Sequence, residues 1–144
     1  MITHQMQPTS TSCGPACVAM LAGIPVADVM AEFPKRFSAA KLKKLLRGQK
    51  ITTNKTNVSE MWRLLKGYGL SMGPRRDVGW PPDENPRGLL RVHACMASGH
   101  FRAEWHWLVI ADGHVHDPCA SGPMRELAWF NEHTREKILF YEVE

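Results

Sequence analysis

The sequence predicts an α+β fold in which helices come first and an antiparallel sheet follows. Three observations predict it: apolar residues at helical spacing in the first half of the 144 residues, strand-like apolar runs in the second half, and an Asp112-Gly113 pair between two of those runs. An Asp-Gly pair flanked by apolar runs is typical of a two-residue hairpin turn. The strands on either side of it should therefore pair antiparallel.

Four helices are expected in the first half, because periodic apolar residues lie there between recognisable start and stop residues. The expected ranges are 13–21, capped by Ser12 and ended by Gly23; 26–33, ended by Pro34; 39–47, ended by Gly48; and 57–67. Asn57 and Glu60 have the spacing of a capping box at the start of the fourth helix. Its apolar face is expected to consist of Val58, Met61, Trp62 and Leu65.

The second half opens with a segment, 71–87, whose glycines and prolines predict a long surface loop. Runs of apolar and β-branched residues after it predict strands. The expected strands are 89–96, 105–111, 114–117 and 137–143, with a short helix at 124–130. We therefore expect N-terminal helices packed on a C-terminal antiparallel sheet.

Composition and length are those of one globular domain spanning 1–144, with 44% hydrophobic and 22% charged residues. No stretch approaches the roughly 18 apolar residues of a membrane span, and the N-terminus lacks the pattern of a signal peptide. We therefore expect no membrane segment and a cytoplasmic location. In that compartment the four cysteines should be reduced thiols.

Positive charge is concentrated in the stretch 35–50, although the formal net charge is only +4. Its cations are Lys35, Arg36, Lys41, Lys43, Lys44, Arg47 and Lys50. Two interpretations are open: a surface for an acidic partner, nucleic acid included, or a solvated helix face. The second is favoured, with Phe37, Leu42, Leu45 and Leu46 turned towards the core, so no nucleic-acid partner is expected.

Cys13 is the candidate nucleophile because it opens the best-defined expected helix. Unpaired amides and the macrodipole at a helix N-terminus favour a thiolate, the reactive form of cysteine. Gly14 beside it removes side-chain bulk where a substrate backbone would approach. Cys17, one turn further along the same helix, is expected to pack as a small apolar residue.

The base is chosen among seven histidines by the register of the expected hairpin. A two-residue turn at 112–113 pairs Ala111 with His114 and, further along, places His106 and Asp117 diagonally on one face. Such a pair on an otherwise apolar face must be joined to offset the cost of burial. His106 is therefore the expected base and Asp117 the residue that orients it, while the register sends His114 and His116 to the other face.

The remaining histidines lack an acidic residue in matching register. His100 is the principal alternative to His106, since it also stands near a strand entrance. His4, His93 and His133 are interpreted as surface residues or as core residues with satisfied hydrogen bonds.

An oxyanion formed during acyl transfer needs hydrogen-bond donors, and a glutamine just before the nucleophile can supply one. Gln7 is the candidate and Gln5 the alternative. The non-catalytic interpretation of either glutamine is a polar residue in a frayed N-terminus.

A zinc site is the competing interpretation, with His114, His116, Asp117 and Cys119 as ligands and Cys13 and Cys17 as possible further thiolates. The hairpin register divides those ligands between two faces, so no metal or other cofactor is expected.

Three blocks of sequence resemble the bacteriocin-processing peptidases, papain-like cysteine peptidases that trim double-glycine leaders. They are Gln7-Pro-Thr-Ser-Thr-Ser-Cys13-Gly-Pro-Ala-Cys-Val-Ala-Met, then His106-Trp-Leu-Val-Ile, then His116-Asp117-Pro118. The resemblance implies a papain-like fold in which Cys13 attacks a carbonyl, His106 moves the proton, Asp117 orients the ring and Gln7 stabilises the oxyanion. Ser12 departs from the pattern, because an Asp commonly precedes the nucleophile, and no transporter or ATPase segment follows.

The expected function is that of a cysteine peptidase or related amide hydrolase acting on a peptide or protein. Two alternatives stay open. One is a deamidase or transamidase of protein side chains that uses the same triad. The other is a non-catalytic module that holds a peptide in a groove beside Trp80, Trp105 and Trp107.

Overall fold

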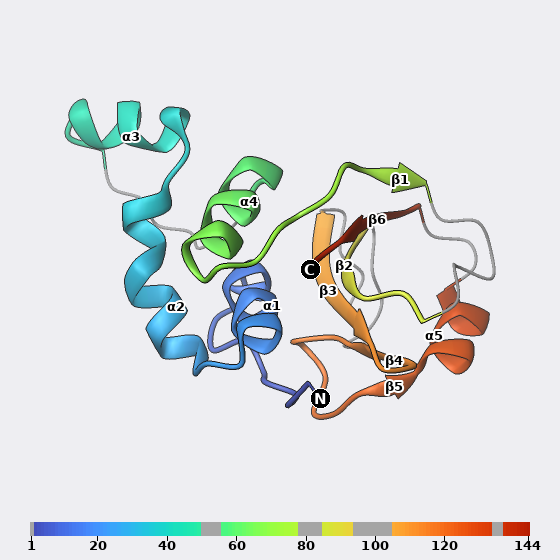
Figure 1. Ribbon diagram of the computed structural model, residues 1–144. Coiled ribbons are helices and arrows are strands. Elements are labelled where there is room, and N and C mark those ends of the chain that lie inside the picture. Colours follow the sequence, from blue (N-terminus) through green and yellow to red (C-terminus); the bar gives the residue numbers. More distant parts are fainter. Residues whose placement is uncertain (1, 50–55, 78–84, 94–104, 134–136) are drawn as a thin grey trace.

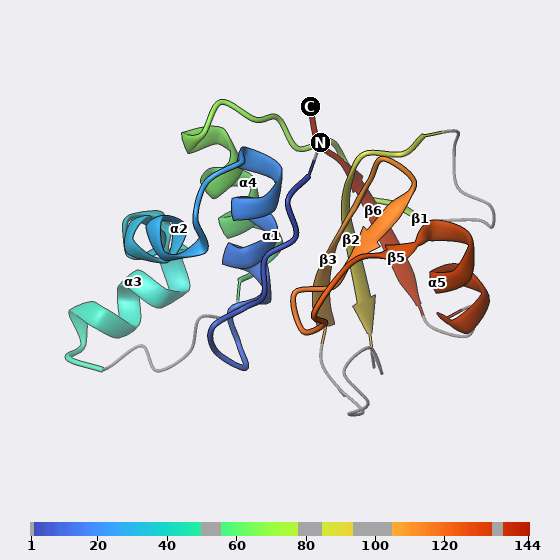
Figure 2. The ribbon, with the colours of Figure 1, turned by 90° about the horizontal axis from the view of Figure 1, so that it is seen from below.

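The computed structural model describes residues 2–49, 56–77, 85–93, 105–133 and 137–144. The expected α+β class is confirmed: within these residues four helices and a 3₁₀ turn precede the sheet strands β2 and β3, and one more helix follows them. Figures 1 and 2 show three layers, with α1 to α4 on one face of the sheet and α5 on the other. The sheet has the strand order β1-β6-β2-β3-β4-β5, and each pair of neighbours is antiparallel.

Helix α1, Cys13–Ala22, is the centre of the helical layer. It begins at the expected residue, and every residue from Cys13 to Leu21 is buried. It ends at Gly23, whose φ of 70° is the left-handed conformation that glycine adopts most easily. The expected cap by the Ser12 side chain is wrong: Ser12 Oγ accepts from Thr9 N–H and donates to Thr9 O, both at 3.0 Å, so it stabilises the preceding turn instead.

The second α-helix ends before Pro34, as expected. Helix α2, Val26–Glu32, passes directly into a 3₁₀ turn, η1, at Phe33–Arg36. Pro34 is tolerated because it lies in the first turn of that element, where its missing N–H would have no partner within the helix.

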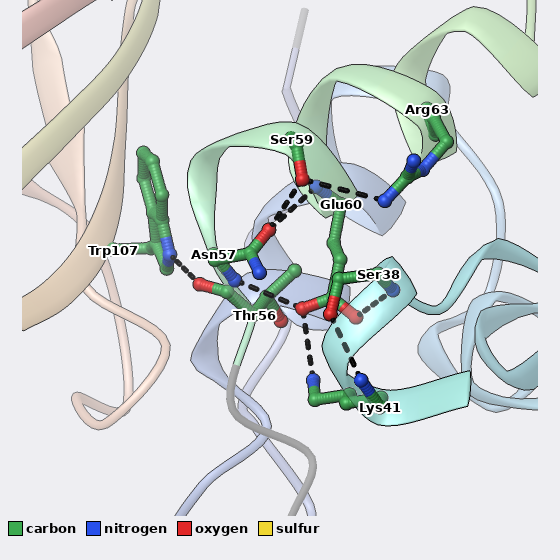
Figure 3. A network of polar contacts seen from close by, with 8 residues as sticks. All are labelled: Ser38, Lys41, Thr56, Asn57, Ser59, Glu60, Arg63 and Trp107. Carbon is green, nitrogen blue, oxygen red and sulfur yellow. Dashed lines mark hydrogen bonds and ion pairs between the residues drawn. The ribbon is translucent and has the colours of Figure 1, made fainter. Parts of the chain in front are cut away.

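Helices α3, Ala39–Leu46, and α4, Val58–Gly67, are joined through Glu60 (Figure 3). The expected capping box is confirmed, since Asn57 Oδ1 accepts from Glu60 N–H at 2.9 Å and Glu60 Oε1 accepts from Asn57 N–H at 3.1 Å. The same buried carboxylate accepts from Ser38 N–H at 2.9 Å and from Lys41 Nζ at 2.8 Å. It therefore fixes the first turns of both helices to each other.

The expected core faces of α3 and α4 are partly wrong. No residue of α3 is buried, and Leu42, Leu45 and Leu46 are 46%, 43% and 87% exposed. Helix α3 lies at the end of the helical layer farthest from the sheet, so the core does not reach its apolar side chains (Figures 1 and 2). On α4, Met61 and Leu65 are buried as expected, whereas Trp62 is 45% exposed and Leu64 fills the core in its place.

The strands agree closely with expectation. They are β2, Gly88–His93; β3, Trp105–Ala111; β4, His114–His116; and β6, Ile138–Glu142; residues 94–96 of the first expected strand lie outside the described residues. The expected hairpin register is confirmed, with Ala111 opposite His114 and Ile110 opposite Val115. Asp112 and Gly113 have φ values of 53° and 74°, as a two-residue turn with two left-handed residues requires.

Two expectations at the edges of the sheet need correction. Within the segment expected as loop, β1, Arg76–Asp77, pairs with β6, and Met72 forms a bridge with Val143. The helix expected at 124–130 is preceded by a short strand, β5, Met124–Arg125, and α5 itself is Glu126–His133. Periodicity misses both strands because two residues are too few to show an alternation.

The two faces of the sheet are covered by separate apolar clusters. Leu108, Ile110 and Val115 pack with Trp129 and Phe130 of α5, as their shared face predicts. The opposite face packs on α1 and α4 through a second set, Leu89, Trp107, Val109, Ala111, Leu139 and Tyr141. Within the described part of the chain no single helix has the length and apolarity to cross a membrane, although α1 and the α2–η1 segment, which are bent by 116° relative to each other, meet that criterion as a pair.

We predict that Glu60→Gln lowers the free energy of unfolding by about 3 kcal/mol, because it leaves the Lys41 ammonium without its charged partner at a buried site. The measurement is urea denaturation followed by circular dichroism. The control is Glu32→Gln, which removes an exposed ion pair with Lys35 and should cost less than about 1 kcal/mol. Equal unfolding free energies for the two variants would contradict the role given to Glu60.

Candidate active site

Cys13 lies at the N-terminus of α1 and is only 7% exposed. The neighbouring Gly14 serves packing: a Cβ at this position would collide with the Thr56 side chain. Thr56 is itself held against the sheet, because its carbonyl accepts from Trp107 Nε1 at 2.8 Å (Figure 3). The glycine that we expected to open a path for substrate thus lets α4 and β3 close around the start of α1.

His106 and Asp117 form the buried pair that the hairpin register predicts. The Nε2 atom of His106 lies 2.8 Å from Asp117 Oδ1, and the two residues are 1% and 4% exposed. Asp117 directly follows β4, and its Oδ1 also accepts from Cys119 N–H at 2.8 Å. The carboxylate is therefore fixed by the turn that follows the strand, and it fixes the imidazole in turn.

The other ring nitrogen of His106, Nδ1, is buried and has no hydrogen-bond partner among the described residues. The ring nevertheless interacts with Cys13, which is one of the groups that shift its pKa. Burial alone would lower the pKa of His106, but the interactions of the ring with Asp117, Cys119 and Cys13 outweigh it and raise the pKa to about 12. The site thus favours an imidazolium beside the Cys13 sulfur.

The two candidate glutamines lie at opposite ends of α1. Gln5 donates from Nε2 to Ile24 O at 2.7 Å and accepts at Oε1 from Val26 N–H at 2.9 Å, so it ties the N-terminal segment to the turn after α1. A ten-residue helix is about 15 Å long, which separates Gln5 from the Cys13 end.

Gln7 instead lies beside the segment that carries Asp117. Its backbone N–H donates to Pro118 O at 2.8 Å, and its Oε1 accepts from the Cys119 thiol at 3.2 Å. Its Nε2 donates to Thr9 O at 2.7 Å, which occupies one of the two amide hydrogens. The N-terminal segment is therefore attached at Gln7 rather than frayed.

Cys119 is the residue of this site whose role the sequence did not predict, although the hairpin register placed it opposite His106. It was considered only as a zinc ligand, yet it joins Gln7 to Asp117 through its thiol and its backbone N–H. One feature of the sequence does indicate the contact with Asp117: Cys119 lies two residues after Asp117, the spacing at which an Asp side chain accepts a backbone N–H.

Cys17 behaves as expected: it is fully buried, and burial, with the nearby Cys13, Asp117 and Cys119, raises the pKa of its thiol.

The zinc constellation considered from the sequence does not assemble in the described residues. His114 Nδ1 lies 3.0 Å from Asp112 O, and His116 stacks on His4 with the two Nδ1 atoms 3.2 Å apart. Among the described residues, ligand atoms of His106, Asp117 and Cys119 do lie within 4.8 Å of one another. Hydrogen bonds already join these three residues to each other and to Gln7, so a metal would have to displace those bonds.

The remaining histidines have structural surroundings. His4 Nε2 lies 2.7 Å from Ala120 O, and His133 Nδ1 lies 2.8 Å from Trp129 O, so both have satisfied hydrogen bonds as expected. Burial, then His4 and His114, lowers the pKa of His116 to about 4, so its neutral ring adds no charge beside Asp117. His100 lies outside the described residues, as does the side chain of His93.

Comparison with known proteins supports the fold. No family model matches the chain, and no curated protein matches its sequence. A solved structure is similar over 99% of this chain and 91% of its own, with a TM-score of 0.50 and 17% sequence identity. It is a double-glycine motif protease from an AMS/PCAT transporter, crystallised with a leader peptide. At this identity the likeness establishes the papain-like α+β fold, which confirms the fold that the sequence resemblance implied.

Proposed function

We propose that this protein is a cysteine hydrolase that cleaves amide bonds in a peptide or protein. One observation carries the proposal: a buried His106–Asp117 pair whose ring also interacts with a cysteine at a helix N-terminus. A thiol becomes a nucleophile when a base or an adjacent cation stabilises its thiolate. Because Asp117 holds Nε2, the unpartnered Nδ1 is the atom that would exchange a proton with Cys13.

In the proposed reaction the Cys13 thiolate attacks the substrate carbonyl carbon and its electron pair forms the new C–S bond. The oxygen becomes an oxyanion that accepts hydrogen bonds from the Cys13 backbone N–H and from the second amide hydrogen of Gln7 Nε2. The His106 imidazolium protonates the departing amine, and a thioester remains on Cys13. A water molecule then gives its proton to His106 and attacks the thioester, which releases the acid and restores the thiolate–imidazolium pair.

A peptide is the proposed substrate class because the similar solved structure is a protease that holds a leader peptide. The structure gives less support than the sequence to the alternative function, a binding groove lined by tryptophans. Trp107 is 2% exposed and donates to Thr56 O, so it is a core residue and cannot line a groove. Trp105 is partly buried, and Trp80 lies outside the described residues.

The proposal predicts that wild-type protein generates new termini in a peptide mixture derived from a proteome, and that Cys13→Ala does not. Mass spectrometry of the products is the measurement, and Cys17→Ala serves as a control that removes a thiol from the core. If glutamine side chains are converted to glutamate and no peptide bond is cleaved, the reaction is deamidation and not hydrolysis of the backbone. No covalent change in any peptide would contradict both reactions and favour the binding module.

Gln7→Ala is expected to lower kcat about 100-fold, the usual effect of removing an oxyanion donor, with little change in KM. The matched control is Gln5→Ala, which removes the same amide from the far end of α1 and should affect thermal stability rather than kcat. The assay is steady-state cleavage of a peptide found in the preceding experiment. Equal kcat values for the two variants would remove Gln7 from the mechanism.

A further inference from the structure

The outward surface of α3 combines exposed leucines with cations. We define the α3 surface as Leu42, Lys43, Lys44, Leu45, Leu46 and Arg47. All six side chains are exposed, and Leu46 is the most exposed large apolar residue of the described chain, at 87%. Three leucines within five residues on a helix that buries nothing are not explained by the core of this protein.

This exposure is not the result of a loosely attached helix. Ser38 Oγ caps α3 by accepting from Lys41 N–H, and Ser38 N–H donates to the buried Glu60 (Figure 3). The Lys41 ammonium pairs with the same carboxylate and lies 4.6 Å from the centre of the Phe33 ring. The first turn of α3 is therefore held by specific polar contacts, while the residues that follow it are exposed leucines and cations.

The charge of the sequence segment that contains α3 is strongly one-sided. Residues 33–59 contain no Asp or Glu, and they contain eight cations: Lys35, Arg36, Lys41, Lys43, Lys44, Arg47, Lys50 and Lys55. The whole chain has 18 Lys and Arg against 14 Asp and Glu, so the residues outside this segment carry all the acids and have a net charge of −4. Within the described residues no ion pair neutralises Lys43, Lys44 or Arg47. The field at this end of the molecule favours an anionic partner.

We propose that the α3 surface docks the protein on an anionic lipid membrane. The leucines would enter the boundary between headgroups and acyl chains, and the lysines and Arg47 would contact the headgroup phosphates and carboxylates. Figures 1 and 2 place α3 at the edge of the molecule away from the sheet, where a flat surface can approach it.

The composition of the surface favours lipid over the other anionic partners. Protein interfaces are depleted in lysine, and their strongest contacts come from aromatic residues and arginine, whereas this surface is built from leucine and lysine. Proteins bind nucleic acids through cations and stacking aromatic rings, and such an interface gives exposed leucines no specific role. A lipid interface uses both kinds of side chain at once.

The test is co-sedimentation of the full chain with vesicles of phosphatidylcholine, either alone or mixed with phosphatidylserine. The wild type should bind only the mixed vesicles. Lys43→Gln with Lys44→Gln should weaken binding about 30-fold, since each cation near an anionic surface contributes about 1 kcal/mol. Leu45→Gln with Leu46→Gln should weaken it about tenfold or more, because the leucines lose their apolar environment.

Two control variants have matched chemistry far from α3. Leu127→Gln changes a leucine that is 64% exposed on α5, and Arg125→Gln removes an exposed cation from β5; both should bind like the wild type. Circular dichroism of each variant checks the fold. The proposal fails if mixed vesicles bind no better than neutral ones, if the leucine variant binds like the wild type, or if the controls lose binding equally. Tighter binding at the same salt concentration to single-stranded RNA or to polyglutamate than to the mixed vesicles would also overturn it.

Discussion

The burial of α1 between the sheet and the other helices is the constraint on which the site depends. All residues from Cys13 to Leu21 are enclosed, so the helix can neither slide nor rotate without opening the core. Its N-terminus is consequently fixed beside β3, and the Thr56–Trp107 hydrogen bond closes α4 over the same point. A cysteine at the first position of such a helix has a defined place relative to any side chain that β3 presents.

That fixed point is surrounded by a chain of polar contacts that joins distant parts of the sequence. Gln7 accepts from Cys119, Cys119 donates to Asp117, and Asp117 binds His106. Each group is at least half-buried, and in a low-dielectric environment an unmade bond in such a chain would be costly. The proposed catalytic groups are therefore held by the same network that attaches the N-terminal segment to the sheet, which is how a small domain can keep them in register before substrate arrives.

The parts of this arrangement that the sequence predicted are those governed by local rules. Asp112-Gly113 sets the hairpin register, and that register is enough to predict that Asp117 meets His106. The contact of Cys119 with Gln7 could not be predicted, because it joins residues 112 positions apart and depends on how the N-terminal segment packs. The same limit explains α3: helical periodicity identified its apolar face, but whether a core lies opposite that face is decided by tertiary structure, and here Leu42, Leu45 and Leu46 meet none.

The proposed mechanism requires His106 to hold Cys13 as a reactive thiolate. The most direct measurement is alkylation by iodoacetamide as a function of pH, with each modified cysteine identified by mass spectrometry in the wild type and in His106→Ala. We expect Cys13 to react faster than Cys17 and Cys119 well below the ordinary thiol pKa of about 8.5, and His106→Ala to remove this advantage. If Cys13 reacts no faster than Cys119, or reacts at the same rate without His106, the proposed thiolate–imidazolium pair does not exist.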